Sequence, residues 1–218
     1  MPEKSRNRIV RAENDIGAID EALEALSAGN CVVYPTETFY ALGADATSAS
    51  ALERLFALKR RETDKPVALI VADLPMARQV AERIPEAALR LAEKFWPGPL
   101  TMVLPARRGL HPALVGPDGG VGLRVSSNPV AHSLVRRFGR PLTATSANLA
   151  GRPPASSLEE ARAAFGDKVK VYLEGGRLGA IPASTVIAFE GKNRFRVLRS
   201  GPISESDIAA ALKSEVSR

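Results

Sequence analysis

Strand-like and helix-like segments alternate along almost the whole chain, and this alternation constrains the fold more than any other sequence feature. The clearest strand is VALIVAD at 67–73, whose continuous apolar run is typical of a strand covered on both faces. Other strand-like runs lie near 9–10 and at 31–36, 100–106, 121–126, 141–147, 169–173, 184–189 and 194–199. The alternation predicts an α/β or α+β domain.

The segments between these strands carry helix signals. Their apolar residues recur at helical spacing, and several of them begin at residue types that cap helices. The predicted helices run from Asn14 or Asp15 to Gly29, from Ser48 or Ser50 to Leu58, and over 75–83, 86–95, 129–135, 157–165 and 204–213. We find no internal repeat and no long linker, so we expect one domain over 1–218.

Composition limits the class of protein. The 218 residues are 45% hydrophobic and 25% charged, which is ordinary for a globular protein. A formal charge of +6 suits an anionic partner such as a nucleotide or RNA, but it also fits a solvated basic surface. One cysteine and two histidines exclude an internal disulfide and a zinc site of the usual type. We see no signal peptide or membrane-spanning run, so we expect a cytoplasmic protein without a membrane partner.

The familiar nucleotide-binding motifs are absent. The sequence has neither the P-loop pattern nor the glycine-rich dinucleotide fingerprint, and it lacks the nucleophile elbow of serine hydrolases. A triphosphate site in this chain would therefore need another construction.

Hydroxyl groups gather at the end of the predicted strand 31–36, in the segment 34–40. Loops that follow buried strands are the usual ligand sites of α/β sheets. The hydroxyls of Thr36 and Thr38 can accept from a substrate ammonium or donate to a carboxylate. The alternative is a simple turn with Thr36 as its cap.

A basic cluster leads into the VALIVAD strand. Lys59 and Arg61 lie two residues apart, with Lys65 nearby, and together they could clamp a polyphosphate. The alternative is a solvated helix end, because cations at a helix C-terminus complement the helix dipole.

Small polar residues end the strand at 141–147 and continue into a Gly/Pro loop. Ser146 and Asn148 could form hydrogen bonds to a ligand that approaches the backbone closely. A tight turn with the asparagine in the left-handed conformation is the alternative. Ser184 and Arg199 lie in two shorter segments with weaker signals.

Seven segments, in this order, resemble the YrdC-type threonylcarbamoyl-AMP synthase family. They are YPTETFYALG (34–43), LKRRETDKPVALIV (58–71), FWPGPLTMVLP (95–105), GLRVSSNP (122–129), TATSANLAGRPP (143–154), PASTVI (182–187) and RVLRSGPI (196–203). The resemblance covers about 14–210 and implies the short, single-domain form. It implies an open, twisted, mixed α/β sheet with flanking helices around a concave, positively charged cavity. Ala41 stands where many members have glycine, so we expect its methyl group to alter the fine shape of the site.

The resemblance also implies an activity and a set of site residues. The reaction is L-threonine, bicarbonate and ATP to threonylcarbamoyl-AMP and pyrophosphate, after which a partner complex modifies tRNA beside the anticodon. The residues implied for threonine are Thr36, Thr38, Arg124 and Ser184, and those implied for ATP are Lys59, Arg61, Lys65, Ser146, Asn148 and Arg199. Lys59 and Arg61, together with Mg²⁺, would offset charge on the α-phosphate and the leaving pyrophosphate, and no protein metal ligand is implied.

Two other functions fit the same features. A basic concavity could bind tRNA or double-stranded RNA without catalysis, although only 5% aromatic residues argues against base stacking on single strands. A related enzyme could adenylate a different carbamoyl compound.

Removal of the Arg61 side chain tests the cationic clamp. We expect Arg61→Ala to depress threonine-dependent pyrophosphate release strongly while the protein stays folded, because the transferred phosphoryl group loses charge stabilisation. Pyrophosphate release and circular dichroism would measure the two effects. Near-normal turnover by this variant would count against the clamp.

Overall fold

The computed structural model describes residues 8–11, 16–60, 66–191 and 194–213. Within these ranges the α-helices are α1 (Ile16–Ser27), α2 (Ala49–Lys59), α3 (Leu74–Val80), α4 (Glu86–Phe95), α5 (Pro129–Phe138), α6 (Leu158–Phe165) and α7 (Glu205–Lys213). The strands are β1 (Arg8–Arg11), β2 (Val32–Pro35), β3 (Tyr40–Gly43), β4 (Leu69–Ile70), β5 (Leu100–Pro105), β6 (Gly120–Arg124), β7 (Leu142–Thr143), β8 (Thr145–Ser146), β9 (Val171–Glu174), β10 (Thr185–Phe189) and β11 (Phe195–Arg199). Two short 3₁₀ helices cover Pro112–Leu114 and Gly166–Lys168.

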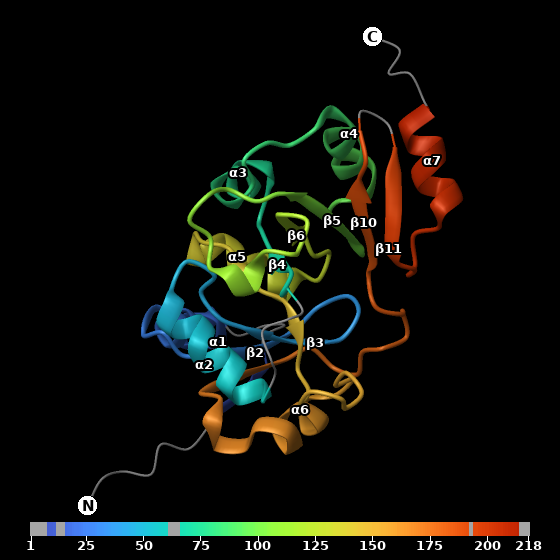
Figure 1. Cartoon of the computed structure of the whole chain (residues 1–218). Helices are drawn as coiled ribbons and strands as arrows, with labels where there is room; N and C mark the ends of the chain where they lie inside the picture. The colour runs from blue at the N-terminus through green and yellow to red at the C-terminus, as the bar shows by residue number, and fades with distance from the viewer. Residues whose placement is uncertain (1–7, 12–15, 61–65, 192–193, 214–218) are drawn as a thin grey trace, which may run out of the picture.

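The strands form two mixed sheets. The first has the order β1-β9-β2-β3-β8, and the second has the order β11-β10-β5-β6-β4-β7. Both contain parallel and antiparallel pairs. Figure 1 shows β2 and β3 in the lower half of the molecule and β5, β10 and β11 in the upper half. The predicted α/β class with mixed pairing is confirmed, and the strands are divided between two sheets.

The chain crosses from one sheet to the other at Ala144. A single strand was predicted over 141–147, but β7 pairs with β4 in the second sheet and β8 pairs with β3 in the first. The N–H of Ala144 donates to the carbonyl of Ala68, and the N–H of Ala147 donates to the carbonyl of Tyr40. Neighbouring residues of this one run therefore form their backbone hydrogen bonds with strands of different sheets.

The VALIVAD run is buried as its apolar composition predicts. The regular strand within this run, β4, is short, because only Leu69 and Ile70 form strand pairs. They pair with β6 on one side and with β7 on the other. Val67 and Val71 are also buried beside this ladder. A strand that the sequence did not predict, β3, returns antiparallel to β2 after the turn at 36–39.

Helix starts follow the predicted capping residues. Ser48 caps α2 by accepting from the N–H of Ala51, and Ser157 caps α6 by accepting from the N–H of Glu160. The Glu160 carboxylate accepts from the N–H of Ser156, one residue before the cap. The predicted cap of the first helix, Asn14 or Asp15, lies outside the described residues.

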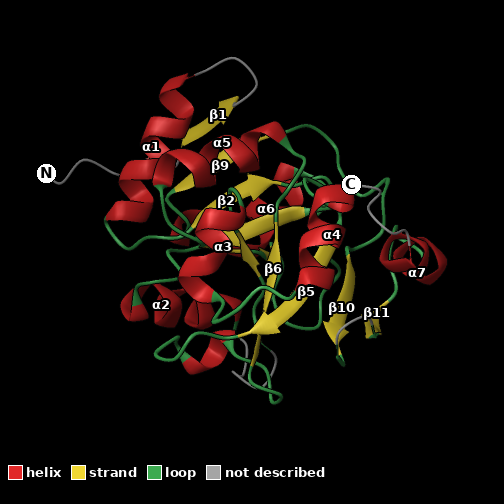
Figure 2. Cartoon of the chain, turned by 90° about the horizontal axis from the view of Figure 1, so that it is seen from above, coloured by secondary structure: helices red, strands yellow, loops and turns green. Residues whose placement is uncertain are grey.

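The second sheet separates a buried face from an open one. Along β5 Leu100 and Met102 are fully buried in the core, while Thr101 and Val103, which alternate with them, line a cavity on the other face. This alternation follows from the two-residue period of a strand. Helix α4 lies along the sheet near β5 and β10 in both ribbon views, and it packs against α7 (Figures 1 and 2).

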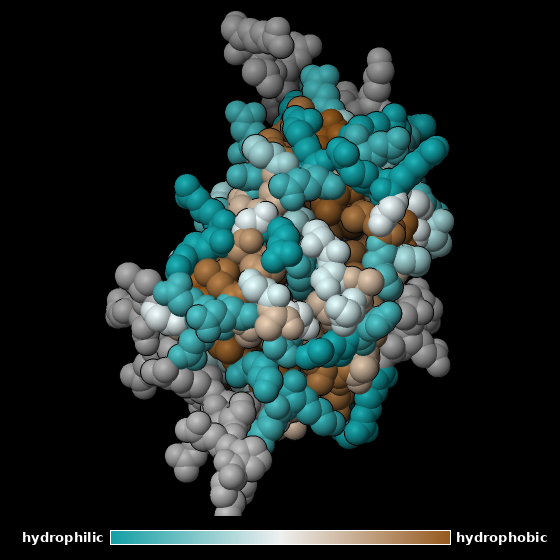
Figure 3. Space-filling view, turned by 90° about the vertical axis from the view of Figure 1, so that its left-hand side faces the viewer, coloured by the Kyte–Doolittle hydropathy of each residue, from teal (hydrophilic) through white to brown (hydrophobic). Residues whose placement is uncertain are grey.

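Two surface properties complete the fold. Figure 3 shows a face that is mostly hydrophilic, with separate hydrophobic spots between the polar side chains. None of the described helices combines the length and the apolar character needed to cross a lipid bilayer.

The single cysteine, Cys31, is buried in the core, and burial raises its pKa to about 12, so it behaves as a small apolar side chain.

Candidate active site

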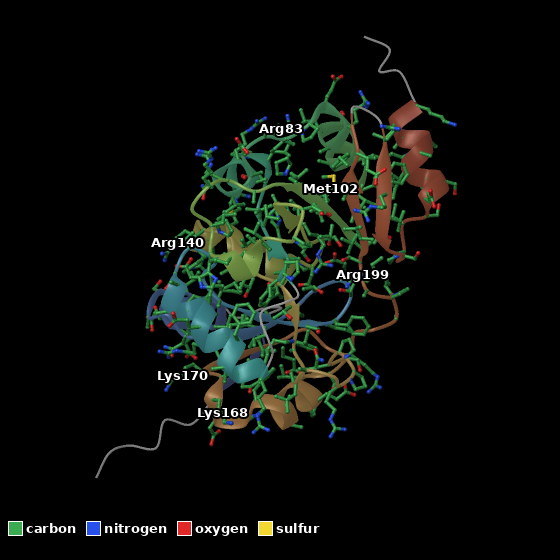
Figure 4. The ribbon with its side chains drawn as sticks, viewed as in Figure 1. Arg83, Met102, Arg140, Lys168, Lys170 and Arg199 are labelled. Carbon is green, nitrogen blue, oxygen red and sulfur yellow. The ribbon has the colours of Figure 1, made fainter. Side chains whose placement is uncertain are left out.

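A cavity of about 1170 Å³ lies between the two sheets. The first sheet contributes residues of β3 and β8, and the second contributes residues of β5, β6, β10 and β11. The described charged side chains in its walls are four arginines, Arg83, Arg124, Arg196 and Arg199, and two carboxylates, Asp118 and Glu190. The predicted concave and positively charged cavity is therefore present. Figure 4 shows Arg199 at mid-height in the view, between the strands of the upper half and those of the lower half.

The turn between β2 and β3 presents two buried hydroxyl groups to this cavity. The Thr36 hydroxyl donates to the carbonyl of Phe39 at 2.7 Å and lies 3.0 Å from the Thr38 hydroxyl. It also accepts from the backbone N–H groups of Thr38 and Phe39. Thr36 therefore closes the turn, as the alternative interpretation predicted, and it also lines the cavity.

A buried ion pair lies behind this turn. The Glu37 carboxylate stands 3.2 Å from the Arg124 guanidinium, and each side chain is 8% exposed. The same carboxylate accepts from the Ser126 hydroxyl, and Arg124 also reaches the Thr38 hydroxyl at 3.5 Å. Glu37 comes from the first sheet and Arg124 from the second, so this ion pair joins the sheets beside the cavity.

A second polar group occupies the wall formed by β5, β10 and β11. The hydroxyls of Thr101 and Ser184 lie 2.9 Å apart, and Arg199 donates to both the hydroxyl and the carbonyl of Ser184 at 2.9 Å. Burial lowers the pKa of Arg199, and the nearby charge of Arg124 lowers it further. Two guanidinium groups that repel each other across a cavity favour an anion between them.

The strand β8 connects the cavity to the end of α2. Ser146 lines the cavity, and its carbonyl accepts from the Lys59 ammonium at 2.5 Å. The side chain of Lys59 is buried behind Ser146. Asn148 accepts from the Ser146 hydroxyl and donates to the carbonyls of Leu149 and Arg152, so it organises the loop after β8.

Asn148 borders a neighbouring cavity rather than the main one. This second cavity measures about 1020 Å³ and shares Phe39 and Pro154 with the first. The two spaces therefore meet at the aromatic ring of Phe39 and the loop after β8.

The structure brings most of the predicted site residues together. Six of them line the main cavity: Thr36, Thr38, Arg124, Ser146, Ser184 and Arg199. Lys59 contacts this group from behind, and Asn148 from the neighbouring cavity. Arg61 and Lys65 lie outside the described residues. The individual roles of these residues stay predictions. Ala41 also lines the cavity.

Sequence reasoning missed three polar residues of this site. Glu37, Thr101 and Ser126 were inside recognised segments, but no role was assigned to them. The available signal was a carboxylate or hydroxyl in or just after a predicted buried strand, because such groups are buried only with partners. Their partners come from distant segments, which the sequence alone does not pair.

The described residues offer no cluster of three or more His, Cys, Asp or Glu side chains that could hold a metal ion. Glu37, a carboxylate close to the cavity, is already bound to Arg124 and Ser126. The two carboxylates in the cavity walls, Asp118 and Glu190, are both paired with Arg196, so no described carboxylate at the cavity is without a cationic partner.

The fold and the site define a mixed α/β protein with a concave cavity whose described walls carry more arginines than carboxylates. Residues 24–201 match the Sua5/YciO/YrdC family model, which is described as telomere recombination, and the chain belongs to this family. The family model covers most of the chain, in agreement with the segments that carried the resemblance.

Curated relatives carry a consistent name. A Photobacterium profundum protein named threonylcarbamoyl-AMP synthase is 35% identical over 162 residues, which cover 72% of this chain and 86% of that protein. A Bacillus subtilis protein of the same name is 32% identical, and the match covers 89% of this chain and 56% of that protein.

Solved structures confirm the fold. A crystal structure of Pyrococcus abyssi Sua5 complexed with L-threonine has a TM-score of 0.87 and 32% identity. The match covers 94% of this chain and 60% of that one, so this chain spans about three fifths of the Pyrococcus protein. A crystal structure of Escherichia coli YciO has a TM-score of 0.79 and 28% identity, with 90% and 96% of the two chains covered.

A glycine beside the cavity provides a test of how its wall is built. A Cβ atom on Gly201 would collide with the carbonyl of Ala183 and the N–H of Thr185, on either side of Ser184. We expect Gly201→Ala to lower the free energy of unfolding by about 1–3 kcal/mol, because backbone rather than a flexible side chain must move. Chemical denaturation would measure this loss.

The matched control is Gly116→Ala in the wall of the same cavity. An added Cβ there would meet its nearest atom at 3.5 Å, an ordinary contact. Equal stability changes in the two variants would contradict the close packing at Gly201.

Proposed function

We propose that this chain is an L-threonylcarbamoyladenylate synthase that forms threonylcarbamoyl-AMP and pyrophosphate from L-threonine, bicarbonate and ATP. The product would pass to a tRNA-modifying transfer complex in the cytoplasm, for threonylcarbamoyladenosine formation beside the anticodon. The observation that carries the proposal is a single cavity that joins buried hydroxyls to two guanidinium groups. The shared name of the curated relatives supports the same activity.

The end of the cavity beside the β2–β3 turn suits a zwitterionic amino acid. The α-carboxylate would lie between Arg124 and Arg199, because both side chains line the cavity and Arg199 has no carboxylate partner among the described residues. The hydroxyls of Thr38 and Ser184 would contact the ammonium group and the threonine side chain. The Thr36 hydroxyl, whose hydrogen bonds are all used within its own turn, would hold that turn against the amino acid. The threonine complex of the Pyrococcus abyssi relative supports this choice of ligand.

The nucleotide would occupy the part of the cavity beside β8. Ser146 lines this part, and the Lys59 ammonium lies directly behind its carbonyl. Asn148 holds the loop that follows. We assign the remaining phosphate contacts to Arg61 and Lys65, because a triphosphate without a P-loop needs several cations.

The reaction then needs positioning and charge stabilisation. The threonine ammonium would first lose one proton to solvent, and the neutral amine would attack carbon dioxide derived from bicarbonate, form a carbon–nitrogen bond and release a second proton to solvent. A carbamate oxygen would attack the α-phosphorus of ATP in line, and the bond to the β-phosphate oxygen would break to release pyrophosphate. Lys59 and Arg61 would offset the developing charge. Mg²⁺ would be bound by the ATP phosphates, in keeping with the absence of a described carboxylate cluster.

The walls of the cavity would serve the labile intermediate. A carbamate loses carbon dioxide readily, so a walled cavity that limits water would protect it. Phe39 and Tyr40 contribute aromatic walls at the amino-acid end. We propose that the whole chain forms one catalytic domain, and binding of tRNA or double-stranded RNA stays a prediction.

The direct test is incubation of the purified chain with ATP, bicarbonate and each amino acid in turn. We expect pyrophosphate release and a threonylcarbamoyl-adenylate mass only when threonine and bicarbonate are both present. Equal turnover with carbamoyl phosphate or with other amino acids would favour the related adenylating enzyme. Salt-sensitive RNA binding without any turnover would favour the RNA-binding module.

Loss of one hydroxyl tests the amino-acid end. We expect Thr36→Val to raise the KM for threonine more than the KM for ATP, because the turn beside the amino acid loses its hydrogen bonds while β8 is untouched. Thr36→Ser keeps the hydroxyl and is the matched control. Equal increases in both KM values would contradict the role of Thr36.

A further inference from the structure

The Glu37–Arg124 ion pair is fixed at both of its ends. The Ser126 hydroxyl donates to Glu37 and accepts from the N–H of Asn128, which is the capping residue of α5. On the other side, one terminal nitrogen of Arg124 meets both Glu37 and the Thr38 hydroxyl. The carboxylate is therefore held between the start of a helix and a guanidinium group.

Glu37 itself does not reach the cavity. The cavity walls include Thr36, Thr38 and Arg124, but Glu37 lies behind them and is 8% exposed. Within the described part of the chain, the Nε and second terminal nitrogen of Arg124 have no protein partner. One edge of the guanidinium is thus held by Glu37, and the donors that remain are available to a carboxylate in the cavity.

Charge at this end of the cavity is limited by the same carboxylate. Arg124 and Arg199 together carry two positive charges, and Glu37 cancels one of them. The balance of one positive charge matches the single carboxylate of an amino acid rather than a polyphosphate.

We propose that Glu37 is a positioning residue that orients Arg124 toward the α-carboxylate of the amino-acid substrate. This inference rests on the proposed function. A guanidinium that is already held loses less freedom when the ligand binds, and fixing a loose side chain typically costs enough to weaken binding about 2- to 10-fold. Glu37 therefore acts on threonine affinity through Arg124, without contacting the substrate.

The test is a double-mutant cycle on threonine-dependent pyrophosphate release. We expect Glu37→Ala to raise the KM for threonine about 2- to 10-fold, with kcat and the KM for ATP changed by less than about twofold. In an Arg124→Ala background, the same substitution should change the KM for threonine by less than about twofold, because its target is gone. A merely structural role of Glu37 would act in both backgrounds.

Two further variants keep the test decisive. Glu37→Gln removes the negative charge that pairs with Arg124 but keeps the side-chain length and an oxygen for the Ser126 hydroxyl, so it should raise the KM for threonine in the same direction as Glu37→Ala, and it replaces the alanine variant if that chain fails to fold. Asp45→Ala is the matched control, because Asp45 is a buried carboxylate paired with Arg140 outside the cavity walls. This control should leave the KM for threonine unchanged.

The outcomes separate the inference from the proposed function. A wild-type chain without threonine-dependent turnover would overturn the function and this inference together. An active wild type in which Glu37→Ala leaves the KM for threonine unchanged, or shifts it equally in the Arg124→Ala background, would overturn the inference alone.

Discussion

The structure depends on polar contacts that join its two sheets beside the cavity. Glu37 in the turn of the first sheet pairs with Arg124 at the end of β6 in the second. A second contact runs from the Tyr34 hydroxyl in β2 to the carbonyl of Thr143 in β7, at 2.8 Å. Buried polar groups of this kind are costly when unpaired, so they hold the two sheets in one relative arrangement. The cavity lies between the two sheets, so contacts that fix the sheets relative to each other also fix its shape.

The groups that line the cavity are also parts of the fold. The Thr36 hydroxyl closes its own turn, and the Ser184 hydroxyl is bound by Thr101 and Arg199. A ligand would therefore meet donors and acceptors whose directions are already set, which lowers the cost of ordering them on binding. Arg199 adds a cation without a carboxylate partner among the described residues, and its depressed pKa reflects burial and the neighbouring Arg124 charge.

Membership of the Sua5/YciO/YrdC family and the geometry of the cavity limit the function in different ways. The family match and the named relatives indicate the reaction. The cavity indicates how two ligands of different charge could be bound side by side, with hydroxyls and a partly compensated arginine pair at one end and β8 at the other. Hydroxyls and arginines can orient substrates and stabilise negative charge without forming a covalent bond to them. This arrangement therefore suits an adenylation that is catalysed by positioning and charge stabilisation.

The sequence by itself determined the α/β class, most element positions and several helix caps, which are local or repeat at fixed spacing, so a single strand or helix reports them. That six of the predicted residues line one cavity followed from the family resemblance and not from local pattern. Only the tertiary structure decided that the run 141–147 divides at Ala144 into strands of two different sheets. It alone also decided that β3 pairs antiparallel with β2 and that Glu37 pairs with Arg124. Each of these is a pairing between segments far apart in the chain, and local propensity carries no information about which distant partner satisfies a strand edge or a buried charge.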